Sequence, residues 1–148
     1  MASNTIQLDG DGFIAEEAVG SGTILPGMLL EKTSAGLVQA HSDEGGRSQK
    51  MVAVEDALQG KTVDDSYSTG DLIQYHIERP GTRFQGLLTA GETVVKGQAL
   101  ISAGDGKLIA ATSIASGEDL DEVTAYAEEA VDLSGSDAVD TLIAVRAA

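Results

Sequence analysis

Two short stretches of the chain approach known phosphate-binding patterns, and a third approaches a calcium loop. EDALQGKT (residues 55–62) ends like a phosphate-binding loop, but Glu55 stands where the first glycine belongs, and its charge opposes phosphate. GDGFIA (residues 10–15) fits the loose GxGxxA dinucleotide pattern, yet Asp11 opposes a pyrophosphate. A calcium loop of the EF-hand type starting at Asp9 would place apolar residues where an acid and a glycine are needed. We therefore expect no bound nucleotide and no metal.

The remaining reactive residue types give no support for catalysis. The chain has two histidines, His41 and His76, and no cysteine, so a closed zinc site would need unusual help from carboxylates. We interpret both histidines as surface residues. No GxSxG nucleophile elbow occurs, and the adjacent acidic pairs at residues 16–17, 64–65 and 128–129 point to opposite faces if they lie in strands. We predict that the protein is not an enzyme and has no cofactor.

The segments that would position these residues are short and interrupted by glycine, which predicts strands. Apolar runs of four to eight residues lie between clusters of Gly, Pro, Asp or Ser, as in an all-β barrel or sandwich. In DLIQYHIE (residues 71–78) polar and apolar side chains alternate, which predicts one solvated and one buried face. We expect a compact, all-β, barrel-like or sandwich-like single domain over residues 13–148, preceded by a flexible N-terminal arm over residues 1–12.

The pentapeptide AEEAV occurs twice, at residues 15–19 and 127–131. Its composition favours a helix, but the first copy lies in a stretch of only seven residues, 13–19, between glycine-rich segments. A helix that short is marginal, whereas a strand of that length is ordinary. In the second copy, the apolar spacing over residues 118–131 also fits a helical stripe. We predict a strand there by analogy, with a helix as the alternative.

The net charge and the lack of apolar spans restrict the partners. Twenty-four Asp and Glu against nine Lys and Arg give a formal charge of −15, which repels nucleic-acid backbones. No apolar run approaches the roughly 18 residues of a membrane span, and the start MASNTIQLDG lacks the features of a signal peptide. We expect a soluble protein with no nucleic-acid or membrane partner. The absence of cysteine is compatible with a reducing cytoplasm.

Most of the chain, from about Gly10 onward, resembles a known family of viral proteins. The run TGDLIQYHIERPGTRFQGLLTAGETVVKGQALISAGDGKLIAA (residues 69–111), followed by AYAEEAVDLS and the closing TLIAVRAA, is similar to the head decoration (capsid cement) proteins of tailed bacteriophages. The resemblance implies a compact β-rich body, usually trimeric, without catalytic residues. It implies a structural virion protein that binds the major capsid protein on the outer surface of the phage head and stabilises the head against genome pressure. Such a protein is made in the cytoplasm of the host bacterium.

Five residues are candidates for a capsid or subunit interface. Ile6 and Leu8 alternate with polar neighbours in the N-terminal arm, which could add a strand to a sheet edge on binding. Arg79, Arg83 and Phe84 flank the RPG turn, and arginine and aromatic residues are enriched in interface cores. We predict contacts with the capsid or with another copy of the chain at these positions.

A lipoyl- or biotinyl-carrier-like barrel is the alternative interpretation. VVKGQALISAGDGKL (residues 94–108) resembles the strand-hairpin-strand half of such a carrier, and Lys107 lies beside a tight turn where a carrier lysine could be modified. However, Lys107 follows the second glycine of the turn and occupies no recognisable carrier tripeptide. A lectin-like β module is a third class, but the sequence offers no aromatic platform for sugars.

Overall fold

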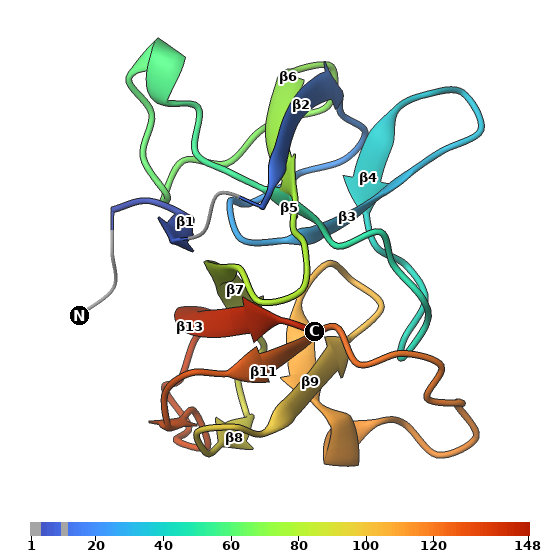
Figure 1. Cartoon of the computed structure of the whole chain (residues 1–148), viewed down its shortest axis with the longest axis vertical. Coiled ribbons are helices and arrows are strands. Elements are labelled where there is room, and N and C mark those ends of the chain that lie inside the picture. The colour runs from blue at the N-terminus through green and yellow to red at the C-terminus, as the bar shows by residue number, and fades with distance from the viewer. Residues whose placement is uncertain (1–3, 10–11) are drawn as a thin grey trace.

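The computed structural model of the chain describes residues 4–9 and 12–148, and within these residues the fold is built from short strands (Figure 1). Helical structure in this part of the chain is limited to two 3₁₀ turns, η1 (Ala57–Gln59) and η2 (Ala111–Ser113). The strands form a closed barrel and a second sheet that belong to one compact domain. The all-β class and the barrel-like single domain expected from the sequence are confirmed.

Five strands close the barrel, which occupies the lower half of Figure 1. In hydrogen-bonded order they are β7 (Arg83–Leu88), β10 (Leu108–Ala110), β9 (Ala99–Ser102), β11 (Ala125–Ala127) and β13 (Thr141–Ala147). The ring closes because β13 also pairs antiparallel with β7 along six residue pairs. A ribbon of β8 (Thr93–Val94) and β12 (Val131–Asp132) lies beside it.

The upper half of Figure 1 is a second five-stranded sheet, which we call the N-terminal sheet. Its strands, in hydrogen-bonded order, are β2 (Ile14–Val19), β6 (Leu72–Ile77), β5 (Met51–Ala53), β3 (Leu29–Lys32) and β4 (Val38–Ala40). An isolated bridge between Gly20 and Val38 brings the end of β2 beside β4. The sheet therefore curls strongly, so that its two outer strands meet at one point.

Strand β6 shows why the predicted alternation produces this structure. Ile73 and Tyr75 are buried, while Leu72 is exposed, so one face of the strand supplies the core and the other lies toward solvent. Glu78, just after the strand, departs from the pattern because it is also buried. The predicted two-faced strand is confirmed, with that one exception at its end.

The two copies of AEEAV differ, because only the first forms a continuous strand. The first forms β2, which pairs antiparallel with β6 over six residue pairs. The second ends β11 at Ala127, bends at Glu128 and Glu129, and enters β12 at Val131. No helix occurs over residues 118–131. The strand prediction is confirmed for the first copy and, in the second, only at Ala127 and Val131, while the helical alternative is wrong.

Two clusters of buried apolar side chains fill the domain. The larger lies in the barrel and continues into the N-terminal sheet through Leu29, Val52 and Val54. The smaller lies inside the N-terminal sheet and includes Tyr75. Leu142 of β13 packs against both clusters. The sheet and the barrel are thus joined by continuous packing.

Gly27 allows the segment before β3 to pass close to the barrel. Its φ of +93° is a left-handed conformation, and a Cβ atom there would overlap the side chain of Leu142 and lie 3.2 Å from the carbonyl oxygen of Gln85. The Gly27 amide donates to Ala53, and its carbonyl accepts a hydrogen bond from the Leu87 amide at 3.2 Å. A glycine is therefore required both for the backbone angle and for the close approach.

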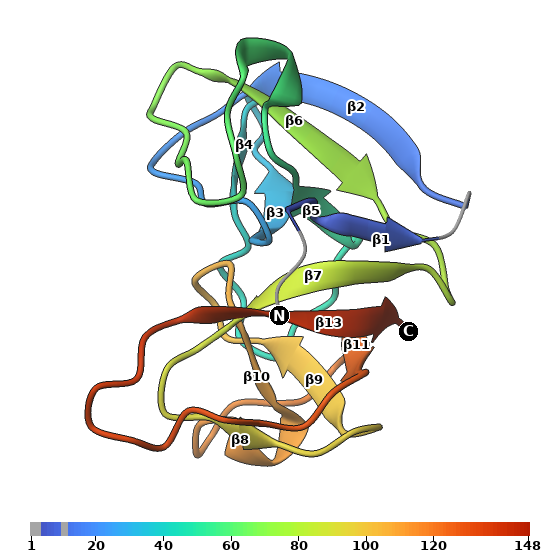
Figure 2. The same ribbon diagram turned by 90° about the vertical axis from the view of Figure 1, so that its left-hand side faces the viewer.

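The N-terminal segment differs from the expected flexible arm. Residues 4–9 lie against the body, with Ile6 fully buried and β1 (Gln7–Asp9) paired antiparallel with β7. Figure 2 shows β1 between β6 and β7, where the N-terminal sheet meets the barrel. The segment docks there because Ile6 enters the core. Residues 1–3 and 10–11 of the expected arm lie outside the described residues.

Candidate interaction surface

Three of the four arginines of the chain gather at one place, around the turn between β6 and β7. Arg83 of β7 lies directly opposite Arg146 of β13, and Arg146 lies opposite Tyr126 of β11. Arg79 stands at the start of the turn and is exposed. We call these four residues, Arg79, Arg83, Tyr126 and Arg146, the arginine surface.

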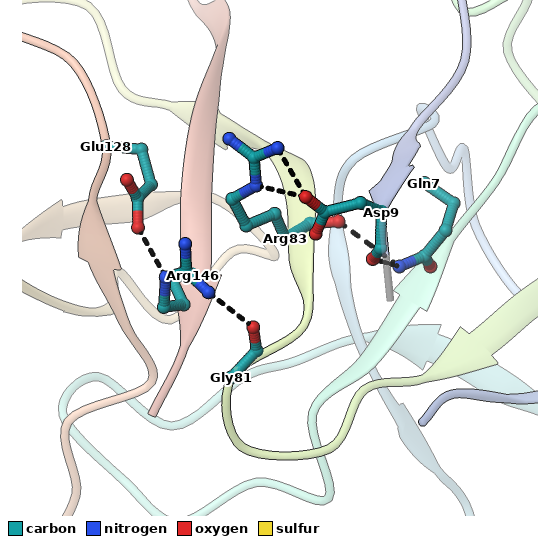
Figure 3. Close-up of polar contacts among 6 residues, drawn as sticks. All are labelled: Gln7, Asp9, Gly81, Arg83, Glu128 and Arg146. Carbon is teal, nitrogen blue, oxygen red and sulfur yellow. Dashed lines mark hydrogen bonds and ion pairs between the residues drawn. The ribbon is translucent and has the colours of Figure 1, made fainter. Parts of the chain in front are cut away.

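The two facing arginines are held by a carboxylate on each side (Figure 3). Arg83 donates from Nε to Asp9 Oδ2 at 2.6 Å, and a second guanidinium nitrogen pairs with the same oxygen. Arg146 donates from Nε to Glu128 Oε1 at 2.6 Å and from Nη1 to the Gly81 carbonyl at 2.8 Å. The hydrogen bond from Arg83 lowers the pKa of Asp9. Like charges directly opposite in a sheet are destabilising, and these two carboxylates offset that repulsion.

These ion pairs are exposed and contribute little to stability, but they fix the direction of the guanidinium groups. Each guanidinium has five N–H donors, of which the intramolecular bonds use only some. The remaining donors of Arg83 and Arg146 are available at the surface. Among residues 4–9 and 12–148, the guanidinium of Arg79 has no hydrogen-bond or ion-pair partner.

The structure separates the five residues predicted for the interface. Ile6 and Phe84 are 0% and 2% exposed in the core, so neither side chain can contact a partner in the folded protein. Ile6 lies just before β1 and Phe84 lies in β7, whose residues 84–88 are all buried, and both side chains belong to the larger core cluster. Leu8 is half-buried on β1. Arg79 and Arg83 reach the surface together.

The sequence did not indicate that Arg146 and Tyr126 belong to this surface. Both lie in strands whose neighbours in the sheet come from distant parts of the chain, so nothing near them in the sequence points to the RPG turn. The available signal was alternation: in TLIAVRAA, Arg146 is flanked by the buried residues Val145 and Ala147 and must therefore face outward.

A buried carboxylate lies beneath this surface. Glu78 is 3% exposed, and its Oε2 accepts hydrogen bonds from Thr82 Oγ1 at 2.6 Å and Gln7 Nε2 at 3.2 Å, while Oε1 has no partner. Burial raises the pKa of Glu78. Gln7 Oε1 in turn accepts a hydrogen bond from His76 Nδ1 at 2.8 Å. Through Gln7, β1 is bound to the residues at the end of β6.

The two histidines occupy different environments. His41, expected at the surface, is buried: its Nδ1 lies 2.7 Å from Ser102 Oγ and its Nε2 lies 2.9 Å from the Arg47 carbonyl oxygen. The loop that carries it folds back on the barrel, and the side chain satisfies polar groups there. His76 is half-buried and stacks on Phe13 with ring centroids 4.2 Å apart. Burial lowers the pKa of His76.

Lys107 is not presented as a carrier lysine would be. Its Nζ lies 3.1 Å from Asp140 and 3.3 Å from Asp105, and only 22% of its side chain is exposed. Burial alone would lower the pKa of Lys107, but the hydrogen bonds with Asp140 and Asp105 outweigh it and raise the pKa. A lysine that receives a cofactor must be accessible and lose a proton to react, and both requirements are opposed here.

The described residues contain neither a clustered set of metal ligands nor a helix that could span a membrane. No group of three or more His, Asp or Glu side chains in this part of the chain is arranged to hold a metal ion. No helix among the described residues has the length and apolar character needed to cross a membrane.

Comparison with known proteins identifies a related fold. No protein-family model matches the chain, and no curated protein matches it. The structure is similar to the crystal structure of the N base of head fiber gp8.5 in bacteriophage phi29, with a TM-score of 0.57 and 15% sequence identity. The similarity covers 92% of this chain and 94% of the other. At this identity the likeness concerns the fold, and it confirms at that level the resemblance to phage head proteins.

Proposed function

We propose that this protein is a structural component of a tailed-phage virion that binds the outer surface of the assembled head. The observation that carries the proposal is the fold similarity to a phage head fiber base over nearly the whole length of both chains. The sequence resemblance to decoration proteins supports the same role. The partner is the major capsid protein, and the protein is made in the cytoplasm of the host bacterium.

The proposed mechanism is linkage between binding and shell stability. A protein that binds the assembled shell more tightly than its separated subunits stabilises the shell by mass action, by about 2.7 kcal/mol per site at a free concentration 100 times Kd. We propose that the protein acts as a homotrimer, because a trimer that touches several capsid subunits gains avidity without high affinity at each contact. The bound trimers then oppose the outward pressure of the packaged genome.

The proposed role requires adhesion and no catalysis. The geometry of Lys107, which is clamped between two carboxylates, gives the carrier alternative no support. The charge of −15 also suits a protein that must stay soluble at high concentration before it binds. We therefore propose that the protein is not an enzyme.

A shell-binding assay tests the proposal. Purified protein is mixed with undecorated, expanded phage shells, and the bound copies and the shell melting temperature are measured as the protein concentration rises. We expect saturable binding with a rising melting temperature, whereas an unrelated protein of similar size and charge should change neither. Failure to saturate any matching shell would refute shell binding. Saturation at a constant melting temperature would refute the stabilising role.

A further inference from the structure

A second surface of the domain carries the opposite charge to the arginine surface. It surrounds a hollow of about 410 Å³ lined by residues of β2, β6 and the η1 segment, and these elements lie at the top of Figure 1. Three carboxylates line this hollow, from Glu17, Asp56 and Asp71. Leu58 and Leu72 line it as well. We call these five residues the acidic face.

The acidic face leaves apolar side chains unusually exposed to solvent. Leu58, in η1, is 89% exposed, and Leu72, at the start of β6, is 45% exposed. Val19 lies opposite Leu72 in the β2–β6 pair and is 43% exposed. Single exposed apolar residues are ordinary, but neighbouring ones mark contact sites. This part of the domain therefore has the character of an interface that is uncovered in the single chain.

The charges of the two surfaces are complementary. One lysine, Lys61, lines the hollow beside the three carboxylates, which leaves a local charge of −2. On the arginine surface two of the three guanidinium groups are paired with Asp9 and Glu128, and that of Arg79 has no ion-pair partner among the described residues. Two copies that each carry −15 repel one another. A contact between copies is favoured where a locally positive surface meets a negative one.

We propose that the acidic face of one copy docks on the arginine surface of a second copy of this chain. The inference rests on the proposed function, because it names the contact that builds the homotrimer. The contact covers Leu58 and Leu72 and pairs Arg79 with carboxylates of the neighbour. The two surfaces are different, so the contact is heterologous, and the proposed homotrimer requires that its rotation close a ring of three copies.

The arginine surface is prepared for this contact. Asp9 and Glu128 already orient Arg83 and Arg146, so these side chains lose little conformational freedom on binding. Tyr126, 43% exposed, adds an amphipathic ring of the kind enriched at interfaces. Of the three arginines of this surface, Arg79 is the one whose guanidinium has no partner among the described residues, so it gains most from the neighbour's carboxylates.

Sedimentation velocity over a concentration series tests the contact with Arg79→Glu. This substitution breaks no described ion pair, so the fold should be kept, and circular dichroism and the melting temperature verify this. The matched control is Lys96→Glu, which makes the same change of charge at an exposed residue that belongs to neither surface. We expect the wild type and Lys96→Glu to associate alike, and Arg79→Glu to associate at least about tenfold more weakly, since like charges at an interface are costly.

The reciprocal variant, Glu17→Arg, tests the other surface. Among the described residues, the Glu17 side chain accepts a hydrogen bond only from Gln74, and this bond is exposed. The substitution therefore also leaves the core intact. We expect Glu17→Arg to associate as weakly as Arg79→Glu. Mixing the two variants should restore pairwise association, because each supplies the intact surface that the other lacks. Independence of association from both substitutions, or a wild type that stays monomeric at its highest soluble concentration, would overturn the inference.

Shell binding measured in parallel separates this inference from the proposed function. If Arg79→Glu remains associated but no longer saturates shells, the arginine surface contacts the shell instead, and the inference is wrong while the function stands. If the wild type associates through these surfaces but binds no shell, the proposed function fails while the contact stands. An Arg79→Glu protein that is monomeric, yet still binds shells weakly, supports both.

Discussion

Replacing Ile6 by alanine tests whether the N-terminal strand is part of the folded body. Ile6 is fully buried in the cluster that also holds Val52 of the N-terminal sheet and Phe84 of the barrel. Its amide donates to Glu55 Oε2 at 3.0 Å, and its carbonyl accepts a hydrogen bond from the Gln85 amide at 2.8 Å. A docked Ile6 therefore stabilises both parts of the domain at once.

The magnitude follows from the burial. Truncating a buried isoleucine to alanine costs about 2–5 kcal/mol through lost transfer free energy and the cavity that remains. This loss has an upper limit, because residues 4–9 at the N-terminus can detach from the body. They detach once the substitution removes the free energy that holds them there. For a domain of this size each kcal/mol lowers the melting temperature by about 2–4 °C. We expect Ile6→Ala to lower it by roughly 4–20 °C.

Urea denaturation and thermal melting measure the effect, with Leu8→Ala as the matched control. Leu8 lies two residues further along the chain, in β1, but is only half-buried, so its truncation should cost clearly less. Hydrogen exchange adds a local measurement, since the Ile6 amide should be protected in the wild type. If Ile6→Ala stays within about 0.5 kcal/mol of the wild type, or matches Leu8→Ala, the segment is not docked in solution and the flexible-arm expectation is correct.

Three further substitutions test the buried polar groups and the backbone. The raised pKa of Glu78, caused by burial, means that its protonated form favours folding and that this contribution is lost as pH rises through the folded pKa. Glu78→Gln should therefore raise the melting temperature relative to wild type at pH 7, and this gain should shrink as pH falls through the raised folded pKa and be absent below 4.5, the ordinary value; a gain independent of pH contradicts the argument. His41→Ala should cost about 1–3 kcal/mol in urea denaturation because it leaves buried polar partners unpaired, and half-buried His76→Ala should cost less. Gly27→Ala should lower the melting temperature far more than Gly22→Ala, which has a similar φ but open space around it; equal losses would show that the close approach is unimportant.

Local pattern was sufficient to predict most strands of this fold. The seven residues that include the first AEEAV are too few for a helix, and the glycines on either side set the ends of β2. The alternation of Ile73 and Tyr75 with polar neighbours gave the buried face of β6. These predictions succeed because the deciding interactions are between residues close in sequence.

The predictions that failed depend on contacts between distant parts of the chain. Ile6 is buried because β7, nearly 80 residues later, offers it an edge and a core. His41 is buried because Ser102 provides a partner 61 residues away. The arginine surface exists because the register of β13 on β7 places Arg146 opposite Arg83. Sequence periodicity assigns a side chain to a face but does not assign the neighbour across the sheet.

The docking of β1 and the arginine surface are physically coupled. Asp9 is the last residue of β1, and it is one of the two carboxylates that offset the repulsion between Arg83 and Arg146. If β1 detaches, Asp9 leaves with it, and the facing guanidinium groups lose half of their counter-charge and much of their fixed orientation. The burial of Ile6 therefore acts on the surface as well as on the core, because it holds Asp9 where Arg83 needs it.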